Sequence, residues 1–208
     1  MPRGGLPGSW TASLGRFSAC RRSAEAAPRQ SQDSRIEMNV PDASPAGELR
    51  TRTVKWAEPV RDLSEFRSLS GLEYLQRLFG QDSRPAPICA LMDFRAVKFE
   101  YGLAVFEGTP REFHYNPVGV VHGAFAAALV DSALGCCVHT TLNPGFSSTT
   151  IELKINYVRA LSSESGLVTS VGRTINVGSR IATSEARLTG ADGRLYAHGT
   201  STCMIFPL

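Results

Sequence analysis

One acidic residue in an apolar setting is the first candidate for chemistry. Asp131 lies in the segment 116–141, where most other residues are small or apolar. On a helix with 100° per residue, its nearest surface neighbours are all uncharged: Ala127, Ala128, Leu134 and Gly135. No polar face therefore explains this carboxylate, and burying it costs free energy unless it has a partner. We expect Asp131 to act in catalysis, with a buried hydrogen bond to the backbone as the structural alternative.

The beginning of the same segment offers a second feature, the pair His122-Gly123 at the expected first turn of the helix. The first N–H groups of a helix have no partner inside it and carry the positive end of its dipole, and glycine allows close approach. An oxyanion could bind there. Asp131 follows His122 by nine residues, which is about 180° around the helix and roughly 13 Å along it. A two-fold dimer could bring His122 and Gly123 of one subunit opposite Asp131 of the other.

Two elements are expected before this helix. Residues 63–79 show a helical apolar stripe, with Ser70 as a candidate N-cap and Gly80 as the residue that closes the helix. Residues 97–107 alternate between apolar and charged side chains, which predicts a strand pair reaching about His114.

Four strand-like segments follow the central helix: 150–157, 167–177, 180–188 and 195–206. In the first, alternation places Ile151 on one face with Leu153 and Tyr157, and Thr150 on the other face. Turn signals separate the segments, and Asp192-Gly193 is the strongest hairpin signal. The prediction is an α+β fold in which a twisted antiparallel sheet wraps around one long helix.

Composition limits the function classes. With 208 residues and 42% hydrophobic content the chain suits one domain, and its formal charge of +3 comes mainly from arginines in the first 35 residues. The remainder is close to neutral, which argues against a nucleic-acid surface, and the apolar runs are too short to cross a bilayer.

Five cysteines without framework or metal-ligand spacing predict buried thiols in a reducing compartment, so we expect a cytoplasmic protein with no metal.

The domain prediction has three parts. Residues 1–45 lack hydrophobic periodicity and predict a disordered leader, with a transit peptide or a true start at Met38 as alternatives. Residues 46–87 predict a helical extension and linker, and residues 88–208 the main domain.

The spacing of Asn116, His122-Gly123 and Asp131, followed by the strand 150–157, resembles the hotdog-fold acyl-CoA thioesterases of the phenylacetate-pathway (PaaI-like) type. The resemblance covers about residues 71–208. Ala124 stands where that family usually has a second glycine, a difference that bears on how closely substrate approaches the helix.

The resemblance implies a hotdog domain that forms a dimer or tetramer and hydrolyses an acyl- or aryl-acetyl-CoA thioester. It implies that the Gly123 N–H, helped by Asn116, polarises the carbonyl, while Asp131 activates water or attacks directly through an anhydride. Thr150 would orient the water, and His122 would position the loop or contact the leaving thiolate. Asn116 could instead be a turn residue beside Pro117, and Thr150 an ordinary strand residue.

Coenzyme A binding is also implied by the resemblance. The family's pantetheine loop matches the turn formed by Asn176, Val177, Gly178, Ser179 and Arg180, and Tyr157 matches a position near the same channel. Arg180 offers a phosphate partner, Arg159 and Arg173 are further basic candidates, and a plain hairpin turn is the alternative. Coenzyme A would be part of the substrate, so no cofactor is expected. His114, His139 and His198 lack metal-ligand spacing and are expected to be surface or strand residues.

Two other functions remain open from the sequence. One is a non-catalytic acyl-CoA-binding hotdog module, which would need a partner or DNA-binding domain. The other is a hotdog enoyl-CoA hydratase or dehydratase, although the N-x5-H-G-x7-D spacing fits thioesterases better.

Overall fold

The computed structural model describes residues 49–59, 64, 67–80 and 86–208. The chain divides into two compact units, Met1–Arg50 and Thr51–Leu208. In the first unit only Leu49 and Arg50 are described, and neither lies in a helix or strand. The predicted leader, residues 1–45, lies outside the described residues.

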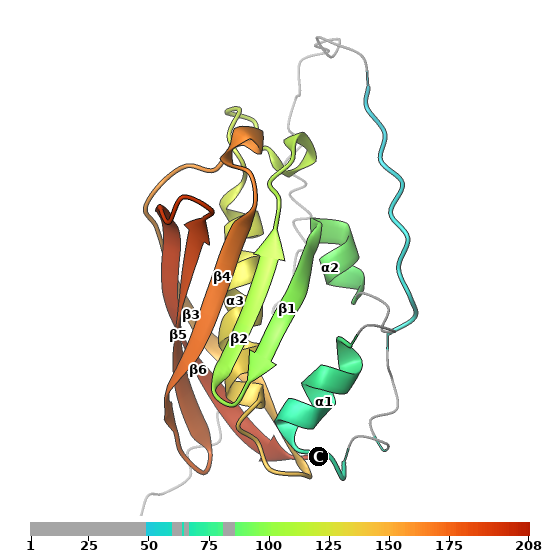
Figure 1. The fold of residues 1–208 in the computed structure, drawn as a ribbon, viewed down its shortest axis with the longest axis vertical. Coiled ribbons are helices and arrows are strands. Elements are labelled where there is room, and N and C mark those ends of the chain that lie inside the picture. Colours follow the sequence, from blue (N-terminus) through green and yellow to red (C-terminus); the bar gives the residue numbers. More distant parts are fainter. Residues whose placement is uncertain (1–48, 60–63, 65–66, 81–85) are drawn as a thin grey trace, which may run out of the picture. The chain divides into compact units, whose positions relative to one another are not determined.

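The second unit is built on one sheet of six antiparallel strands in the order β1-β2-β4-β5-β6-β3 (Figure 1). The strands are β1 (Phe94–Glu100), β2 (Leu103–Gly108), β3 (Phe146–Tyr157), β4 (Val168–Val177), β5 (Ile181–Gly190) and β6 (Leu195–Pro207). Strands β1 and β3 form the two edges. The predicted hairpin at Asp192-Gly193 is confirmed, since the Gly190 N–H donates to the Arg194 carbonyl at 3.0 Å and Gly193 has a φ of 79°.

The long helix α3 (Gly123–His139) packs against the inner face of this sheet, so the predicted α+β architecture is confirmed (Figure 1). Leu129, Val130, Ala133 and Leu134 of α3 are completely inaccessible to solvent. Full burial of each larger aliphatic side chain contributes about 1.5–3 kcal/mol relative to leaving it exposed. The apolar composition of the helix is therefore explained by its place at the centre of the core.

Two short helices precede the sheet. Helix α1 (Gly71–Leu78) begins after Ser70, which forms a capping box with Glu73, so the predicted N-cap is confirmed. The C-cap is Phe79 rather than Gly80, because the Phe79 N–H reaches the Leu75 carbonyl at 2.9 Å. Helix α2 (Pro87–Met92) was not expected from the sequence. The second predicted strand ends at Gly108, well before His114, which lies in the 3-10 helix Glu112–His114 (η2).

A β-bulge changes which residues of β3 face the helix. Thr150 pairs with Cys203 and Glu152 with Thr202, so Ile151 is an additional residue on β3. An extra residue reverses the alternation beyond it. Thr150 consequently shares the inner face with Leu153 and Tyr157, and the predicted assignment of Thr150 and Ile151 to faces was wrong.

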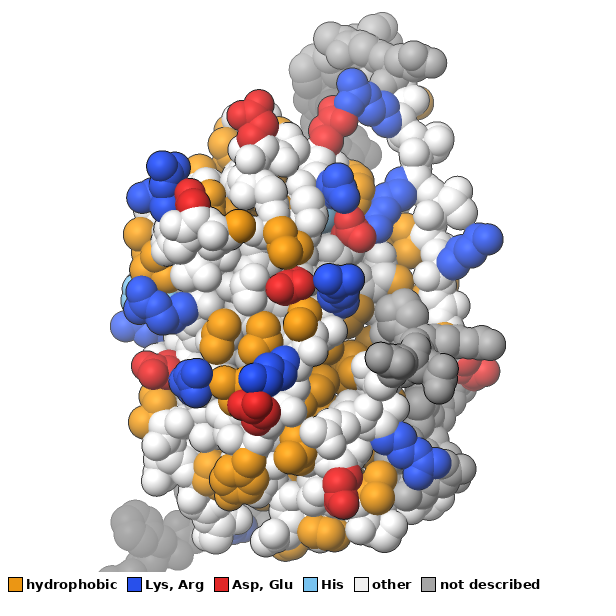
Figure 2. All heavy atoms as spheres, viewed as in Figure 1, with side chains coloured by type: hydrophobic (Ala, Val, Ile, Leu, Met, Phe, Trp, Pro, Cys, Tyr) orange, Lys and Arg blue, Asp and Glu red, His pale blue; other side chains and the backbone are white. Residues whose placement is uncertain are grey.

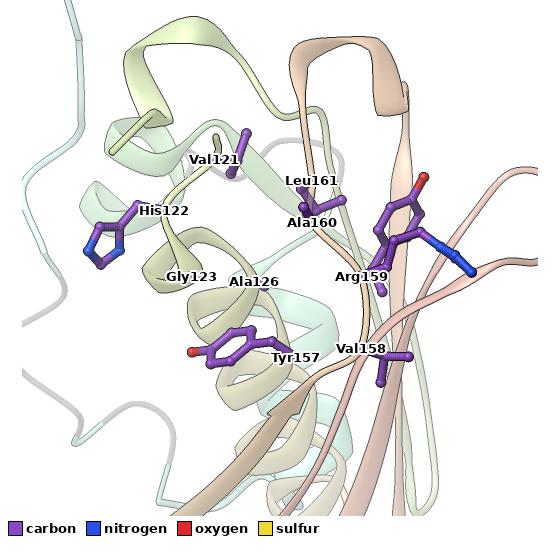
Figure 3. A pocket seen from close by; sticks show the side chains of 10 residues that line it. Val121, His122, Gly123, Ala126, Tyr157, Val158, Arg159, Ala160 and Leu161 are labelled. Atoms are coloured by element: carbon purple, nitrogen blue, oxygen red, sulfur yellow. The ribbon is translucent and has the colours of Figure 1, made fainter. Parts of the chain in front are cut away.

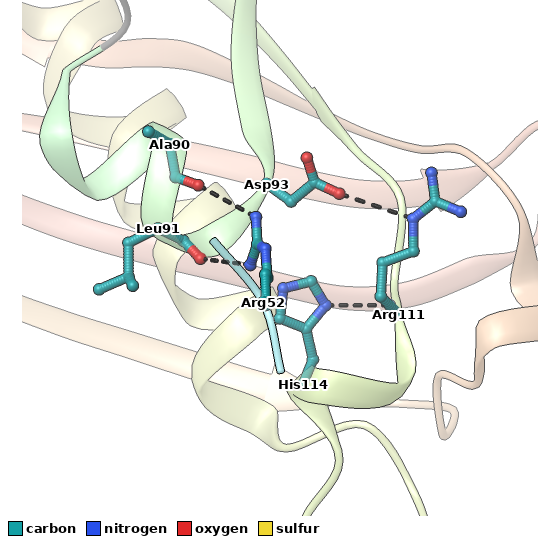
Figure 4. A network of polar contacts seen from close by, with 6 residues as sticks. All are labelled: Arg52, Ala90, Leu91, Asp93, Arg111 and His114. Atoms are coloured by element: carbon teal, nitrogen blue, oxygen red, sulfur yellow. Dashed lines mark hydrogen bonds and ion pairs between the residues drawn. The ribbon is translucent and has the colours of Figure 1, made fainter. Parts of the chain in front are cut away.

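Arg52 fixes the segment 51–59 to this unit (Figure 4). Its guanidinium donates to the carbonyls of Leu91 at 2.9 Å and Ala90 at 3.1 Å, at the C-terminal end of α2. The same group lies 3.8 Å from the centre of the Phe113 ring. A cation is favoured at both positions, by the helix dipole and by the ring quadrupole.

The face drawn in Figure 2 carries Lys and Arg side chains interspersed with Asp and Glu, among hydrophobic side chains. No area of a single charge forms on this face. Among the described helices, none combines the length and the apolar content needed to cross a bilayer.

Candidate active site

His122 caps the beginning of α3. Its ring atom Nδ1 accepts a hydrogen bond from the Ala124 N–H at 3.0 Å. The backbone N–H of His122 donates to the His114 carbonyl at 2.7 Å. The N–H of Gly123 has no acceptor within the described part of the chain, as expected for the first amide of a helix. A donor at the positive end of the α3 dipole is therefore available to a ligand.

Tyr157 packs directly on this first turn. A Cβ atom added to Gly123 would lie 3.0 Å from Cζ of Tyr157, so only glycine lets the ring approach without displacement. A cavity of about 400 Å³ opens here, and it is lined by Gly123, Tyr157 and Arg159 among others (Figure 3). The Arg159 side chain extends away from Gly123 and is exposed. We call this space the helix-start cavity.

Asn116 stabilises the loop before α3. Its side-chain oxygen accepts hydrogen bonds from the N–H groups of Val118 at 3.1 Å and Val120 at 3.3 Å. Its backbone closes the same turn through the Val120 carbonyl and the Gly119 N–H. The side-chain oxygen thus has a role in the turn, and the side-chain nitrogen makes no hydrogen bond among the described residues.

Asp131 lines a second cavity of about 360 Å³, here called the Asp131 cavity. Its Oδ1 accepts a hydrogen bond from the hydroxyl of Thr150 at 3.1 Å, and both side chains are half-buried. Its Oδ2 has no hydrogen-bond partner in the part of the chain that the structure describes. A carboxylate held through one oxygen, with the other open to a cavity, is suited to accept a proton or to attack an electrophile.

Cys136 and Cys203 also line the Asp131 cavity. Burial raises the pKa of both thiols, and the nearby carboxylate of Asp131 raises them further. The thiols are therefore protonated at neutral pH. Cys203 is buried as predicted, whereas Cys136 is half-buried.

The two cavities have no lining residue in common. Gly123 and Asp131 accordingly face different spaces within one subunit, as the helical geometry predicted. The strand β3 joins them, with Thr150 beside Asp131 and Tyr157 beside Gly123.

Asn176 and Val177 are the last residues of β4, and Gly178, Ser179 and Arg180 connect it to β5; all five residues are exposed. None of them lines the helix-start cavity or the Asp131 cavity. The turn lies at the same end of the sheet as Thr150, because Val177, Ala182, Cys203 and Thr150 form one row across four strands. Three strand spacings separate Val177 from Thr150, which is about 14 Å.

Two histidines differ from expectation. His114 is buried beneath Phe113 and Phe125, and His139 is a half-buried residue in the last turn of α3 that lines the Asp131 cavity. Tyr74 of α1 lines the same cavity and had no signal in the sequence, since only the packing of α1 brings it there. Among the described residues, no group of three His, Cys, Asp or Glu side chains could hold a metal ion.

Comparison with known proteins gives the family. Residues 118–197 match the family model of the thioesterase superfamily. A candidate esterase of Saccharolobus solfataricus, SSO2140, is 30% identical over 110 residues, which are 53% of this chain and 76% of that protein. Similar solved structures include the conserved protein PA5202 of Pseudomonas aeruginosa, with a TM-score of 0.55, 28% identity and coverage of 59% of this chain and 95% of that one. Another is an N33D mutant of the phenylacetic acid degradation protein PaaI of Thermus thermophilus. It has a TM-score of 0.52 and 27% identity, and the match covers 57% of this chain and 98% of that one. The chain belongs to the thioesterase superfamily, as a hotdog-fold member of the PaaI type.

Proposed function

We propose that the protein hydrolyses an acyl-CoA thioester to the free acid and coenzyme A, and that it does so as a homodimer or a tetramer of such dimers. The observation that carries the proposal is that α3 holds two groups suited to one reaction, Asp131 and the Gly123 N–H, in two separate cavities. Asp131 with Thr150 supplies a proton acceptor, and Gly123 supplies an unpaired N–H. Of the described residues, those lining the Asp131 cavity include a proton acceptor but no oxyanion donor at a helix start, and those lining the helix-start cavity include the donor but no carboxylate.

The edge strand β3 supports a dimer that joins the two groups. β3 pairs only with β6 among the described strands, so its other edge presents unpaired backbone groups. Antiparallel pairing of two β3 strands about a two-fold axis near Leu153 and Lys154 would set Thr150 of one copy opposite Tyr157 of the other. Asp131 of one copy would then face Gly123 of the second.

The chemistry follows from these groups. The thioester oxygen would accept a hydrogen bond from the Gly123 N–H, where the α3 dipole stabilises developing negative charge. Oδ2 of Asp131 would take a proton from the attacking water while the Thr150 hydroxyl holds Oδ1. Collapse of the tetrahedral intermediate breaks the C–S bond and releases the thiolate, near which exposed His122 would lie. Direct attack by Asp131 through an anhydride is the second route.

Coenzyme A would enter along the helix-start cavity. Tyr157 forms one wall of this cavity, and the exposed Arg159 offers a partner for the phosphates. The exposed turn formed by Asn176, Val177, Gly178, Ser179 and Arg180 would contribute a second contact with the coenzyme A portion of the substrate.

The test is release of free thiol from a panel of acyl-CoA esters by the full chain. Asp131→Asn should lower kcat/KM by about 100-fold or more, because a positioned base usually contributes that much. Glu185→Gln, which makes the matched change on the exposed face of β5, should leave the rate unchanged. Size-exclusion chromatography should give a dimer or larger for both variants.

Three results would contradict the proposal. Retention of more than about a tenth of the rate by Asp131→Asn would exclude the base role. Binding of acyl-CoA without turnover by the unmodified chain would indicate a sensor module. Hydration of an enoyl-CoA without thiol release would indicate a hydratase.

A further inference from the structure

Helix α1 forms one wall of the Asp131 cavity. Tyr74 and Leu75 come from this helix, and Asp131, Cys136 and His139 come from α3 on the opposite side. Figure 1 shows α1 beside the end of β1, close to the C-terminus of the chain. The cavity that contains the proposed base is thus bounded by an element outside the sheet and the central helix.

This wall is firmly attached. The Gly71 N–H donates to the Leu142 carbonyl at 2.9 Å, and a Cβ on Gly71 would overlap the carbonyl oxygen of His139, so the two helices touch through their backbones. Leu75 is only 4% exposed. Just after the helix, the Phe79 ring lies 5.5 Å from that of Phe99. These contacts hold α1 in one position beside α3.

Tyr74 and His139 stand at the far end of the Asp131 cavity. Their ring centres are 5.1 Å apart with the planes tilted by 48°. Both rings also line a second, smaller space of about 30 Å³, whose other walls include Phe146 and Leu208. A space of that size has room for about one or two water molecules. The aromatic pair therefore lines both the Asp131 cavity and a much smaller open space beside it.

The end wall is uncharged. Burial lowers the pKa of His139 below its usual value, so its imidazole is neutral near pH 7. Burial raises the pKa of Tyr74, which keeps its phenol protonated. Two neutral rings suit contact with the apolar end of an acyl group rather than with the phosphates of coenzyme A.

We propose that Tyr74, packed against His139, closes the acyl pocket and restricts the protein to compact acyl groups. The inference rests on the proposed function, because it assumes that the acyl chain extends from the thioester past Asp131 into this cavity. Longer chains meet the Tyr74 ring. Removing that ring would join the Asp131 cavity to the smaller space and to the apolar side chains around it.

The experiment measures binding of non-hydrolysable S-alkyl-CoA thioethers with butyl, hexyl, octyl and dodecyl chains by calorimetry. For the unmodified chain, affinity should rise by about fourfold per methylene while the chain fits, and then stop rising or fall. Tyr74→Ala should extend the rise to the longer chains and improve dodecyl binding by about tenfold or more. Tyr74→Phe keeps the ring and should retain the original profile.

Tyr101→Ala is the matched control, since it removes an aromatic ring that is 74% exposed in the β1–β2 turn. It should leave the profile unchanged. Circular dichroism and the thermal midpoint establish that each variant is folded. A folded Tyr74→Ala variant with the same chain-length profile as the unmodified chain would overturn the inference, and so would a shift that Tyr74→Phe reproduces.

Turnover keeps the two proposals separate. One outcome is that no thioester is hydrolysed, while the thioethers show the predicted length limit and Tyr74→Ala removes it. This result would support the pocket inference and contradict the hydrolase proposal. The other outcome is that thioesters are hydrolysed, but Tyr74→Ala leaves the ratio of the rates for short and long chains unchanged. This result would support the hydrolase proposal and contradict the pocket inference.

Discussion

The hydroxyl of Thr150 lies 3.1 Å from Oδ1 of Asp131, although the two residues belong to different elements and lie 19 positions apart. The contact depends on the bulge at Ile151, which places Thr150 on the inner face of β3. A regular strand would direct this hydroxyl away from α3. The strand irregularity therefore positions a side chain beside the proposed base.

Thr150→Val removes the hydrogen bond while keeping the shape of the side chain. Hydrogen bonds to charged groups contribute about 1.5–3 kcal/mol, so we expect kcat to fall by about tenfold or more with little change in KM. Steady-state kinetics measures this. Thr200→Val, on the exposed face of β6, should behave as the unmodified chain. An unchanged kcat in Thr150→Val would mean that the hydroxyl plays only an ordinary strand role.

Gly123→Ala should disturb the ring of Tyr157, because the added methyl would lie 3.0 Å from it. We expect kcat/KM to fall by about tenfold or more, as misplacement near a reacting group has large effects. Tyr157→Ala alone should mainly raise KM. In a double-mutant cycle, Gly123→Ala should cost less in the Tyr157→Ala background. Strict additivity would show that the ring and the helix start act independently.

The proposed roles of Arg159 and Arg180 in coenzyme A binding can be tested separately. Arg159→Met should raise KM by about tenfold with kcat preserved, and the effect should shrink at high salt, because a phosphate contact of this kind is electrostatic. Arg180→Met should act in the same direction if the β4–β5 turn meets the substrate. Arg187→Met, on the exposed side of β5, is the control. An Arg159 variant with unchanged KM would remove this residue from the binding site.

We expect the free energy of unfolding to fall in acid because of two histidines. Burial lowers the pKa of His114 and of His139, so below the unfolded-state pKa of about 6.5 the unfolded chain binds more protons than the folded chain. Stability is therefore complete above about pH 6.5 and declines as the pH falls through that value. At His114 burial is the main cause of the lowered pKa, and the Nδ1 atom accepts the Arg111 N–H at 3.0 Å, a bond that the neutral ring can make (Figure 4).

Urea midpoints at about pH 7.5 and pH 5 test this. His139→Asn should reduce the difference between the two midpoints, because it removes one of the titrating groups. Equal midpoints at both pH values in the unmodified chain would contradict the prediction.

Much of the fold could be predicted because its signals are local. The helix around Asp131, the Ser70 cap, the strands after the helix and the Asp192-Gly193 hairpin each depend on residues close together in the chain. The separation of Gly123 from Asp131 also followed from helical geometry, and the structure places them at different cavities. The short helix α2 escaped prediction because six residues offer too little periodicity.

The sequence by itself determined which groups can do chemistry and that one subunit holds them apart, since a regular helix sets both angle and distance between its residues. Only the tertiary structure decided which side chains surround those groups. The face of Thr150 depends on pairing with β6, the position of Tyr74 on the packing of α1 against α3, and the burial of His114 on contact with Phe125. Such contacts join residues far apart in the chain, and they leave no periodic pattern near either partner.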